Sequence, residues 1–157
     1  MKRRGILANF RGSSERRYRL ARMRDVVRVR ARVLKRLLEE ARRNPSEECC
    51  GLLAGKEKVI SEILPARNQL GSATAYEIAP EELFQLFKQM RAAGLEHLGI
   101  YHSHPLGDNT PSAADIERAF YPDVAYLIVS PGAEPVRAVR AFRIREGLVE
   151  ELEVRPV

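Results

Sequence analysis

Residues 99–115 read GIYHSHPLGDNTPSAAD and contain two of the three histidines of the chain. His102 and His104 are two residues apart, so their imidazoles share one face if the preceding apolar strand continues through them. The glycine, asparagine and proline of the following turn favour a chain reversal. Ser112 and Asp115 are three residues apart, about one helical turn, and can both face that strand. Two imidazoles and a carboxylate are ligands that catalytic zinc accepts, so the stretch predicts a metal site of His102, His104 and Asp115.

Each of these residues also has a simpler interpretation. Ser112 and Asp115 have the spacing of a helix N-terminal capping pair. A histidine at a strand end is most often only hydrogen-bonded or exposed, and we interpret the third one, His97, as a surface residue. The convergence of two histidines, a turn and a capped acid in one short stretch favours the metal site.

The apolar patterns on both sides of this stretch predict an α/β domain. Short strands alternate with amphipathic helices, and a mixed β-sheet flanked by about three helices accounts for them. Strands are expected at 26–29, 47–56, 59–66, 73–78, 95–104, 124–130, 136–145 and 148–154, and helices at 33–43, 80–93 and 112–120. The last two strands predict a hairpin turning at Glu146 and Gly147, with arginines opposite glutamates.

The net charge of +6 is unevenly distributed along the chain. Residues 1–43 contain 16 Lys and Arg against 4 Asp and Glu, whereas residues 44–157 contain 11 against 17. We therefore expect two parts: a basic, disordered extension at residues 1–23, or sequence upstream of a true start at Met23, and one domain at residues 24–157. A phosphate-binding arm is the alternative. The arm does not interleave aromatic with basic residues, so we expect no nucleic-acid partner, although its charge leaves that question open.

The sequence contains no apolar run of the roughly 18 residues that a membrane helix requires and no apolar leader. Its only two cysteines, Cys49 and Cys50, are adjacent and cannot form a disulfide framework. We therefore expect a cytoplasmic protein without a membrane partner.

The pattern HSHP, a short spacer and SAAD, with ECCGLL upstream, resembles the JAMM (MPN+) metallopeptidase family, in its compact prokaryotic type. The resemblance covers about residues 24–154 and implies an MPN-type fold with the layering of cytidine deaminases. It places the zinc ligands on His102, His104 and Asp115, with one Zn²⁺ per chain. It places the catalytic glutamate on Glu48, with Glu47 as the competitor, since a slip of one residue turns the carboxylate to the other face of the strand.

The resemblance also implies a function. Zinc lowers the pKa of a bound water, Glu48 takes up its proton and later protonates the leaving amine, and the Ser112 hydroxyl donates to the oxyanion. Members of the family cleave the bond after the C-terminal glycines of ubiquitin-like proteins. The expected substrate is thus a ubiquitin-like or sulfur-carrier protein.

Two other functions stay open. The loop GDNTPSAADI also resembles the RadC-type branch, whose role is linked to DNA, although ECCGLL fits the peptidase branch better. The second alternative is a non-catalytic scaffold that binds protein partners through the same fold. Since all five candidate residues are present, we favour an active peptidase.

Overall fold

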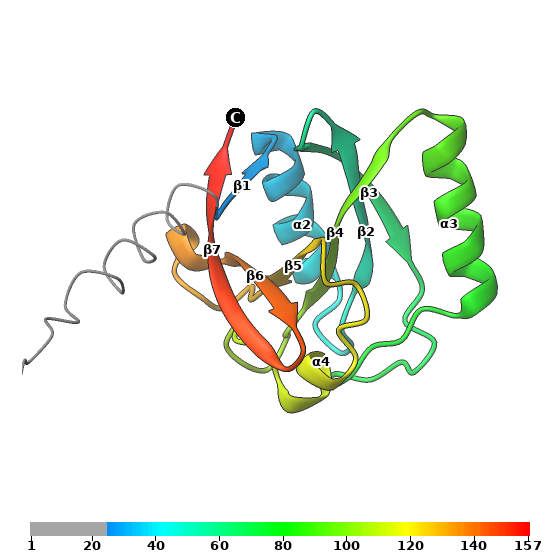
Figure 1. The fold of residues 1–157 in the computed structure, drawn as a ribbon. Helices are drawn as coiled ribbons and strands as arrows, with labels where there is room; N and C mark the ends of the chain where they lie inside the picture. Colours follow the sequence, from blue (N-terminus) through cyan, green and yellow to red (C-terminus); the bar gives the residue numbers. More distant parts are fainter. Residues whose placement is uncertain (1–24) are drawn as a thin grey trace, which may run out of the picture.

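The computed structural model describes residues 25–157, and the expected basic extension at residues 1–23 lies outside them (Figure 1). Within the described part, strands and helices alternate as the sequence predicts. The strands are β1 (Val26–Val29), β2 (Cys50–Lys56), β3 (Val59–Ala66), β4 (Glu96–Ser103), β5 (Ala125–Val129), β6 (Val139–Arg145) and β7 (Leu148–Pro156); the α-helices are α2 (Ala31–Arg43), α3 (Pro80–Ala92) and α4 (Ala113–Glu117).

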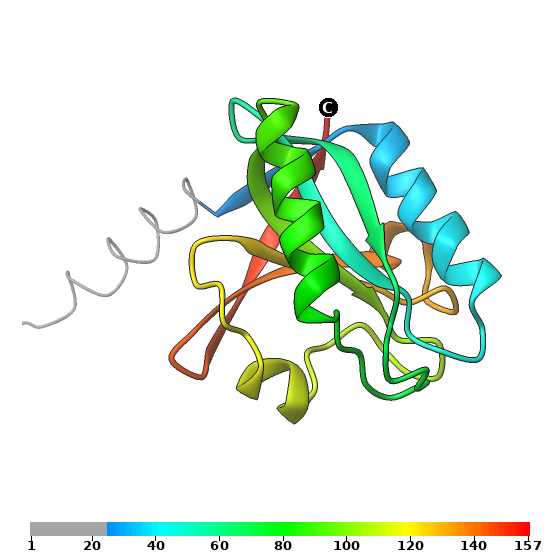
Figure 2. The same cartoon turned by 90° about the vertical axis from the view of Figure 1, so that its right-hand side faces the viewer.

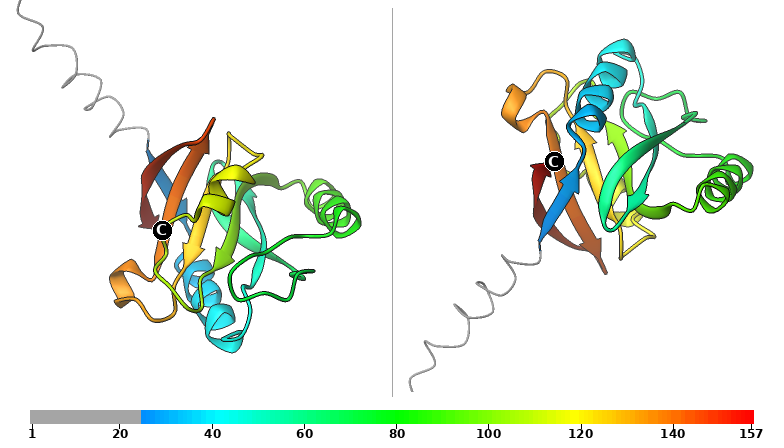
Figure 3. Two further views of the ribbon diagram at one scale, coloured as in Figure 1. Left: turned by 90° about the horizontal axis from the view of Figure 1, so that it is seen from below. Right: turned by 90° about the horizontal axis from the view of Figure 1, so that it is seen from above.

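The seven strands form a closed barrel in the order β1-β3-β2-β4-β5-β6-β7 (Figure 3). The sheet is mixed, because β4 runs antiparallel to β2 and parallel to β5. The barrel closes through the short strand β1, which pairs in parallel with β3 on one side and β7 on the other. The predicted fold class, a mixed sheet with about three helices, is confirmed, and the closure into a barrel is an addition to it.

Helices α2 and α3 cover opposite faces of the strands (Figure 2). Side chains from all seven strands face inward and form one core with α2, to which Tyr101 of β4 belongs. The outer faces of β2, β4, β5 and β6 form a second core with α3, to which Ile100 of β4 belongs. Because side chains alternate along a strand, His102 points to the outer face, on the side of α3.

The predicted β6–β7 hairpin forms as expected, and β2 and β3 form a second one. Glu57 and Lys58 between β2 and β3 both have positive φ, at 52° and 58°, as a two-residue turn matched to the strand twist requires. The β6–β7 hairpin turns at Glu146 and Gly147, again with positive φ. Its cross-strand pairs are Arg140 with Glu151 at 2.8 Å and Arg143 with Glu150 at 3.1 Å.

Four predicted elements differ from the structure by three residues or more. The strand expected at 47–56 begins only at Cys50. Residues 73–78 form no strand, because the Asn68 side chain binds the main chain of Ala75 and Glu77 in place of a neighbouring strand. Helix α4 ends at Glu117 rather than Phe120. Strand β6 begins at Val139, after a 3-10 turn at Pro135–Arg137. None of the described helices is long and apolar enough to cross a membrane.

Candidate active site

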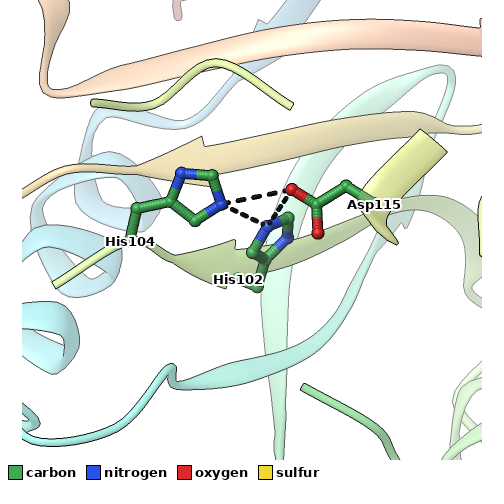
Figure 4. A group of neighbouring side chains, drawn as sticks. All are labelled: His102, His104 and Asp115. Atoms are coloured by element: carbon green, nitrogen blue, oxygen red, sulfur yellow. Dashed lines mark hydrogen bonds and ion pairs between the residues drawn. The ribbon is translucent and has the colours of Figure 1, made fainter. Parts of the chain in front are cut away.

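The two histidines and the aspartate predicted as metal ligands lie together at the end of β4 (Figure 4). The Nε2 atoms of His102 and His104 are 3.0 Å apart. Asp115 Oδ2 lies 3.2 Å from each of them. His102 is 1% exposed, and the side chains of His104 and Asp115 are 12% and 10% exposed.

Strand pairing explains why both histidines point the same way. His102 is opposite Cys50 of β2 and Ile128 of β5. His104 lies one residue beyond β4, but its main-chain N–H still donates to the Val129 carbonyl, so the extended path continues. The Nδ1 atom of His104 bonds the Asp108 carbonyl, which leaves Nε2 directed at the other two groups.

Helix α4 positions the carboxylate through a reciprocal cap. The Ser112 hydroxyl oxygen accepts from the Asp115 N–H at 3.1 Å, and Asp115 Oδ2 accepts from the Ser112 N–H at 2.8 Å. The capping interpretation of this pair is therefore confirmed. It is compatible with the other role expected for Ser112, because the cap uses the hydroxyl oxygen as an acceptor and leaves its proton free to donate.

Glu48 reaches the same side of the sheet from the β2 end. It lies two residues before Cys50, which pairs with His102, and it is close enough to His104 and Asp115 for their charges to shift its pKa. Glu48 is 3% exposed, and its Oε2 atom has no hydrogen-bond partner among residues 25–157. Burial raises the pKa of Glu48 to about 7; the charge of His104 opposes this rise and that of Asp115 adds to it.

The competing glutamate has a different environment. Glu47 is half-buried, and its carboxylate lies near Gly71, where an added Cβ would be 3.6 Å from Oε2. The two glutamates therefore differ in burial, because Glu48 is buried and Glu47 is half-buried beside Gly71.

Burial and hydrogen bonding shift the pKa values of the three clustered residues in different directions. Burial lowers the pKa of His102. For His104, the bonds to Asp115 and the Asp108 carbonyl outweigh burial and raise the pKa. Burial would raise the pKa of Asp115, but the bonds from both histidines hold it well below its usual range. Asp115 is thus a carboxylate at neutral pH, as a metal ligand must be.

The donor set fits a small divalent cation. Two ligand atoms on a tetrahedral zinc are about 3.4 Å apart, close to the separations of 3.0 and 3.2 Å found here. The cluster could hold a metal ion through two imidazole nitrogens and one carboxylate oxygen.

Comparison with known proteins places this geometry in a family. The model of the prokaryotic homologs of the JAB domain matches residues 30–145, which include all the residues of the cluster and Glu48. The chain belongs to the JAB (JAMM) family. The membership expected from the HSHP and SAAD motifs is thereby confirmed.

Named relatives agree with this membership. A desampylase of Haloferax volcanii is 39% identical over 106 residues, which cover 66% of this chain and 76% of the relative. A CysO-cysteine peptidase of Mycobacterium bovis is 32% identical over 131 residues, which cover 82% of this chain and 90% of the relative. The solution structure of a Desulfitobacterium hafniense protein has a TM-score of 0.75 at 29% identity and covers 84% of this chain and 92% of its own. The expected hydrolase class is confirmed by the family and these relatives.

Two residues of this JAB domain that the sequence patterns did not identify lie next to the cluster. The ring of Tyr76 stacks on His102, with centroids 4.5 Å apart and planes at 23°. Asn68 is buried, and its amide bonds the Glu48 carbonyl. Both lie in the segment between β3 and α3, part of which was predicted as a strand, and no local spacing marks either of them.

The third histidine is not the surface residue that was predicted. His97 is half-buried between the rings of Phe87 and Tyr121, and its Nε2 lies 3.1 Å from the Gly99 carbonyl oxygen. It therefore belongs to the α3 core and has no contact with the cluster. On the opposite face of β4, the Tyr101 hydroxyl donates to Glu40 and the Ser103 hydroxyl accepts from the Cys49 N–H.

Proposed function

We propose that this JAB-family chain is a zinc-dependent peptidase or isopeptidase that cleaves the bond after the C-terminal glycines of a ubiquitin-like or sulfur-carrier protein. The observation that supports this most is a buried carboxylate, Glu48, which has an unpartnered oxygen and a pKa of about 7 and feels the charges of His104 and Asp115 in the cluster. A general base works best when its pKa is near the working pH.

In this proposal His102, His104 and Asp115 hold one zinc ion per chain. Bound zinc would supply Lewis-acid chemistry and lower the pKa of a coordinated water towards neutrality. The residues of the chain then carry out proton transfer and stabilise the negative charge. Glu48 accepts the water proton and delivers it to the leaving amine, and the Ser112 hydroxyl donates to the oxygen that gains negative charge.

The substrate class is supported by the names of the relatives, a desampylase and a CysO-cysteine peptidase. A protein from Thermus thermophilus that is 39% identical over 116 residues is named a probable TtuB-protein conjugate cleaving protease. From these names we infer that the chain recognises the C-terminal tail of a ubiquitin-like protein. A cytoplasmic location also remains part of the proposal, and the free, buried state of Cys49 and Cys50 agrees with a reducing compartment.

Mass spectrometry of a ubiquitin-like protein extended beyond its Gly-Gly end tests the proposal. The zinc-loaded protein should release the extension with a single cut after the second glycine, and chelation should stop the reaction. Zinc content is measured on the same sample by elemental analysis. An intact substrate in the presence of one bound zinc per chain would contradict peptidase activity on this class and would favour the scaffold alternative.

A further inference from the structure

The main chain of Glu48 lies outside the strand ladder. The pairing of β2 with β4 begins at Cys50, two residues later. The Glu48 N–H donates to the Ser72 carbonyl at 2.8 Å, and its carbonyl accepts from Asn68 Nδ2 at 3.1 Å. The segment between β3 and α3, residues 67–79, therefore holds Glu48 in place of a neighbouring strand.

Asn68 is the centre of this segment. It is 6% exposed, and its Nδ2 also donates to the Ala75 carbonyl at 2.9 Å. Its Oδ1 accepts from the N–H groups of Leu70 at 3.1 Å and Glu77 at 3.2 Å. A side-chain amide offers two donors and one acceptor oxygen, and all of them are used here.

The bonds from Asn68 bracket the residue that covers the cluster. Ala75 and Glu77 are the neighbours of Tyr76, whose ring stacks on His102 at 4.5 Å. One amide thus connects the main chain of Glu48 to the main chain on both sides of Tyr76.

We propose that Asn68 is a positioning residue for the reaction. Its bonds hold the main chain of Glu48 and connect it to the main chain on both sides of Tyr76. The same side chain therefore places the base and holds the segment at residues 67–79 over the cluster. Asn68 contacts none of the proposed ligands and acts through Glu48. This inference rests on the proposed function, because it assigns the residue to the same site.

Kinetics of Asn68 variants test the inference. Asn68→Ala removes the whole amide, and Asn68→Asp keeps an acceptor for Leu70 and Glu77 but loses the donors to Glu48 and Ala75. Both should lower kcat about 10- to 100-fold on the extended ubiquitin-like substrate, with KM changed less than about threefold and zinc content unchanged. Gln69→Ala is the matched control, because exposed Gln69 bonds the Glu77 carboxylate and not Glu48; it should stay within about twofold of wild type.

A double variant separates positioning from general stability. In a Glu48→Ala background no carboxylate is left to orient, so adding Asn68→Ala should change the residual rate less than about twofold. An equal loss in both backgrounds would show that Asn68 does not act through Glu48 and would overturn the inference.

Hydrogen exchange gives a readout that does not depend on activity. In Asn68→Ala the Leu70 and Glu77 amides, which donate to Asn68 Oδ1, should exchange more than about tenfold faster. The Glu48 amide should do the same, because its partner Ser72 lies in the segment that Asn68 holds. The Cys49 amide, held at 2.9 Å by the Ser103 hydroxyl, should keep its protection. An unchanged exchange rate of the Glu48 amide would refute the inference that Asn68 holds Glu48, even if activity fell. A wild-type protein that cleaves nothing would contradict the proposed function instead, and the exchange data would still decide whether Asn68 holds Glu48.

Discussion

Glu48 is buried and feels the charges of His104 and Asp115, whereas Glu47 is half-buried beside Gly71. We expect Glu48→Gln to abolish turnover of the extended ubiquitin-like substrate, because the amide cannot accept a proton. Glu47→Gln is the matched control and should retain most of the activity. Steady-state rates measured at equal zinc content check both. If Glu47→Gln lost activity and Glu48→Gln kept it, the general base would be Glu47.

The same burial has a consequence for stability. The pKa of Glu48 in the folded protein is about 7, above its ordinary value of 4.5. The folded state therefore binds this proton more tightly than the unfolded chain. The stabilisation is complete below about pH 4.5 and is lost as the pH rises through about 7.

Glu48→Gln should remove this dependence. In the metal-free protein, the variant should gain on the order of 2 kcal/mol in unfolding free energy relative to wild type between pH 5 and pH 8. Urea unfolding in the presence of a chelator at both pH values measures the difference. A constant difference at the two pH values would mean that Glu48 is not a desolvated carboxylate.

Ser112 has a capping role in the structure and a donor role in the proposal. Ser112→Ala removes both and should lower kcat about 10²- to 10³-fold. Ser112→Gly also lacks the donor but is a better helix cap than alanine, so it should be more stable and equally slow. Ser112→Thr keeps the hydroxyl and should recover activity to within about tenfold of wild type. A near-normal kcat in Ser112→Gly would show that Ser112 caps the helix and does not act as a donor in the reaction.

At the scale of elements, the β2–β4 pair depends on one close approach. A Cβ added to Gly51 would lie 2.4 Å from the Leu64 carbonyl oxygen and 2.7 Å from the Tyr101 ring. Tyr101 cannot move freely, because it is fully buried and its hydroxyl donates to Glu40 at 2.8 Å. Gly51 thus lets β2, β3 and β4 pack around the residue that precedes His102.

Gly51→Ala should accordingly destabilise the protein by about 3 kcal/mol, through overpacking against main chain and a fixed ring. Gly132→Ala is the control, since nothing lies within 4 Å of its added Cβ, and it should change stability by less than about 0.5 kcal/mol. Denaturant titration of both variants compares them. Equal unfolding free energies of the two variants would show that β2 and β4 can move apart at Gly51 without a cost in stability.

At the scale of the whole molecule, the barrel brings together groups that are distant in the sequence. Glu48 precedes β2, the histidines end β4, and Asp115 is carried by α4. A metal ion that binds His102, His104 and Asp115 would therefore link β4 to α4 only in the folded state.

Zinc should consequently raise the melting temperature, and a ligand at about 1,000 times its Kd contributes about 4 kcal/mol. Calorimetry with zinc and with chelator measures the shift. His104→Ala, which removes one ligand, should lose most of it. A zinc-dependent shift that persists in this variant would place the ion elsewhere.

Local patterns in the sequence determined the order and type of most elements. They also determined the grouping of His102, His104 and Asp115, because strand alternation, a turn and a helix cap are local rules. The expected strand at 73–78 was wrong, because the Asn68 side chain binds the main chain of Ala75 and Glu77 in place of a neighbouring strand, and the apolar pattern does not reveal such a bond. Barrel closure likewise depends on the pairing of β1 with β7 at the two ends of the domain. The sequence by itself determined which proposed ligands gather. The tertiary structure decided the burial of Glu48 and its connection through Asn68 to Tyr76, because both depend on contacts between separate segments of the chain.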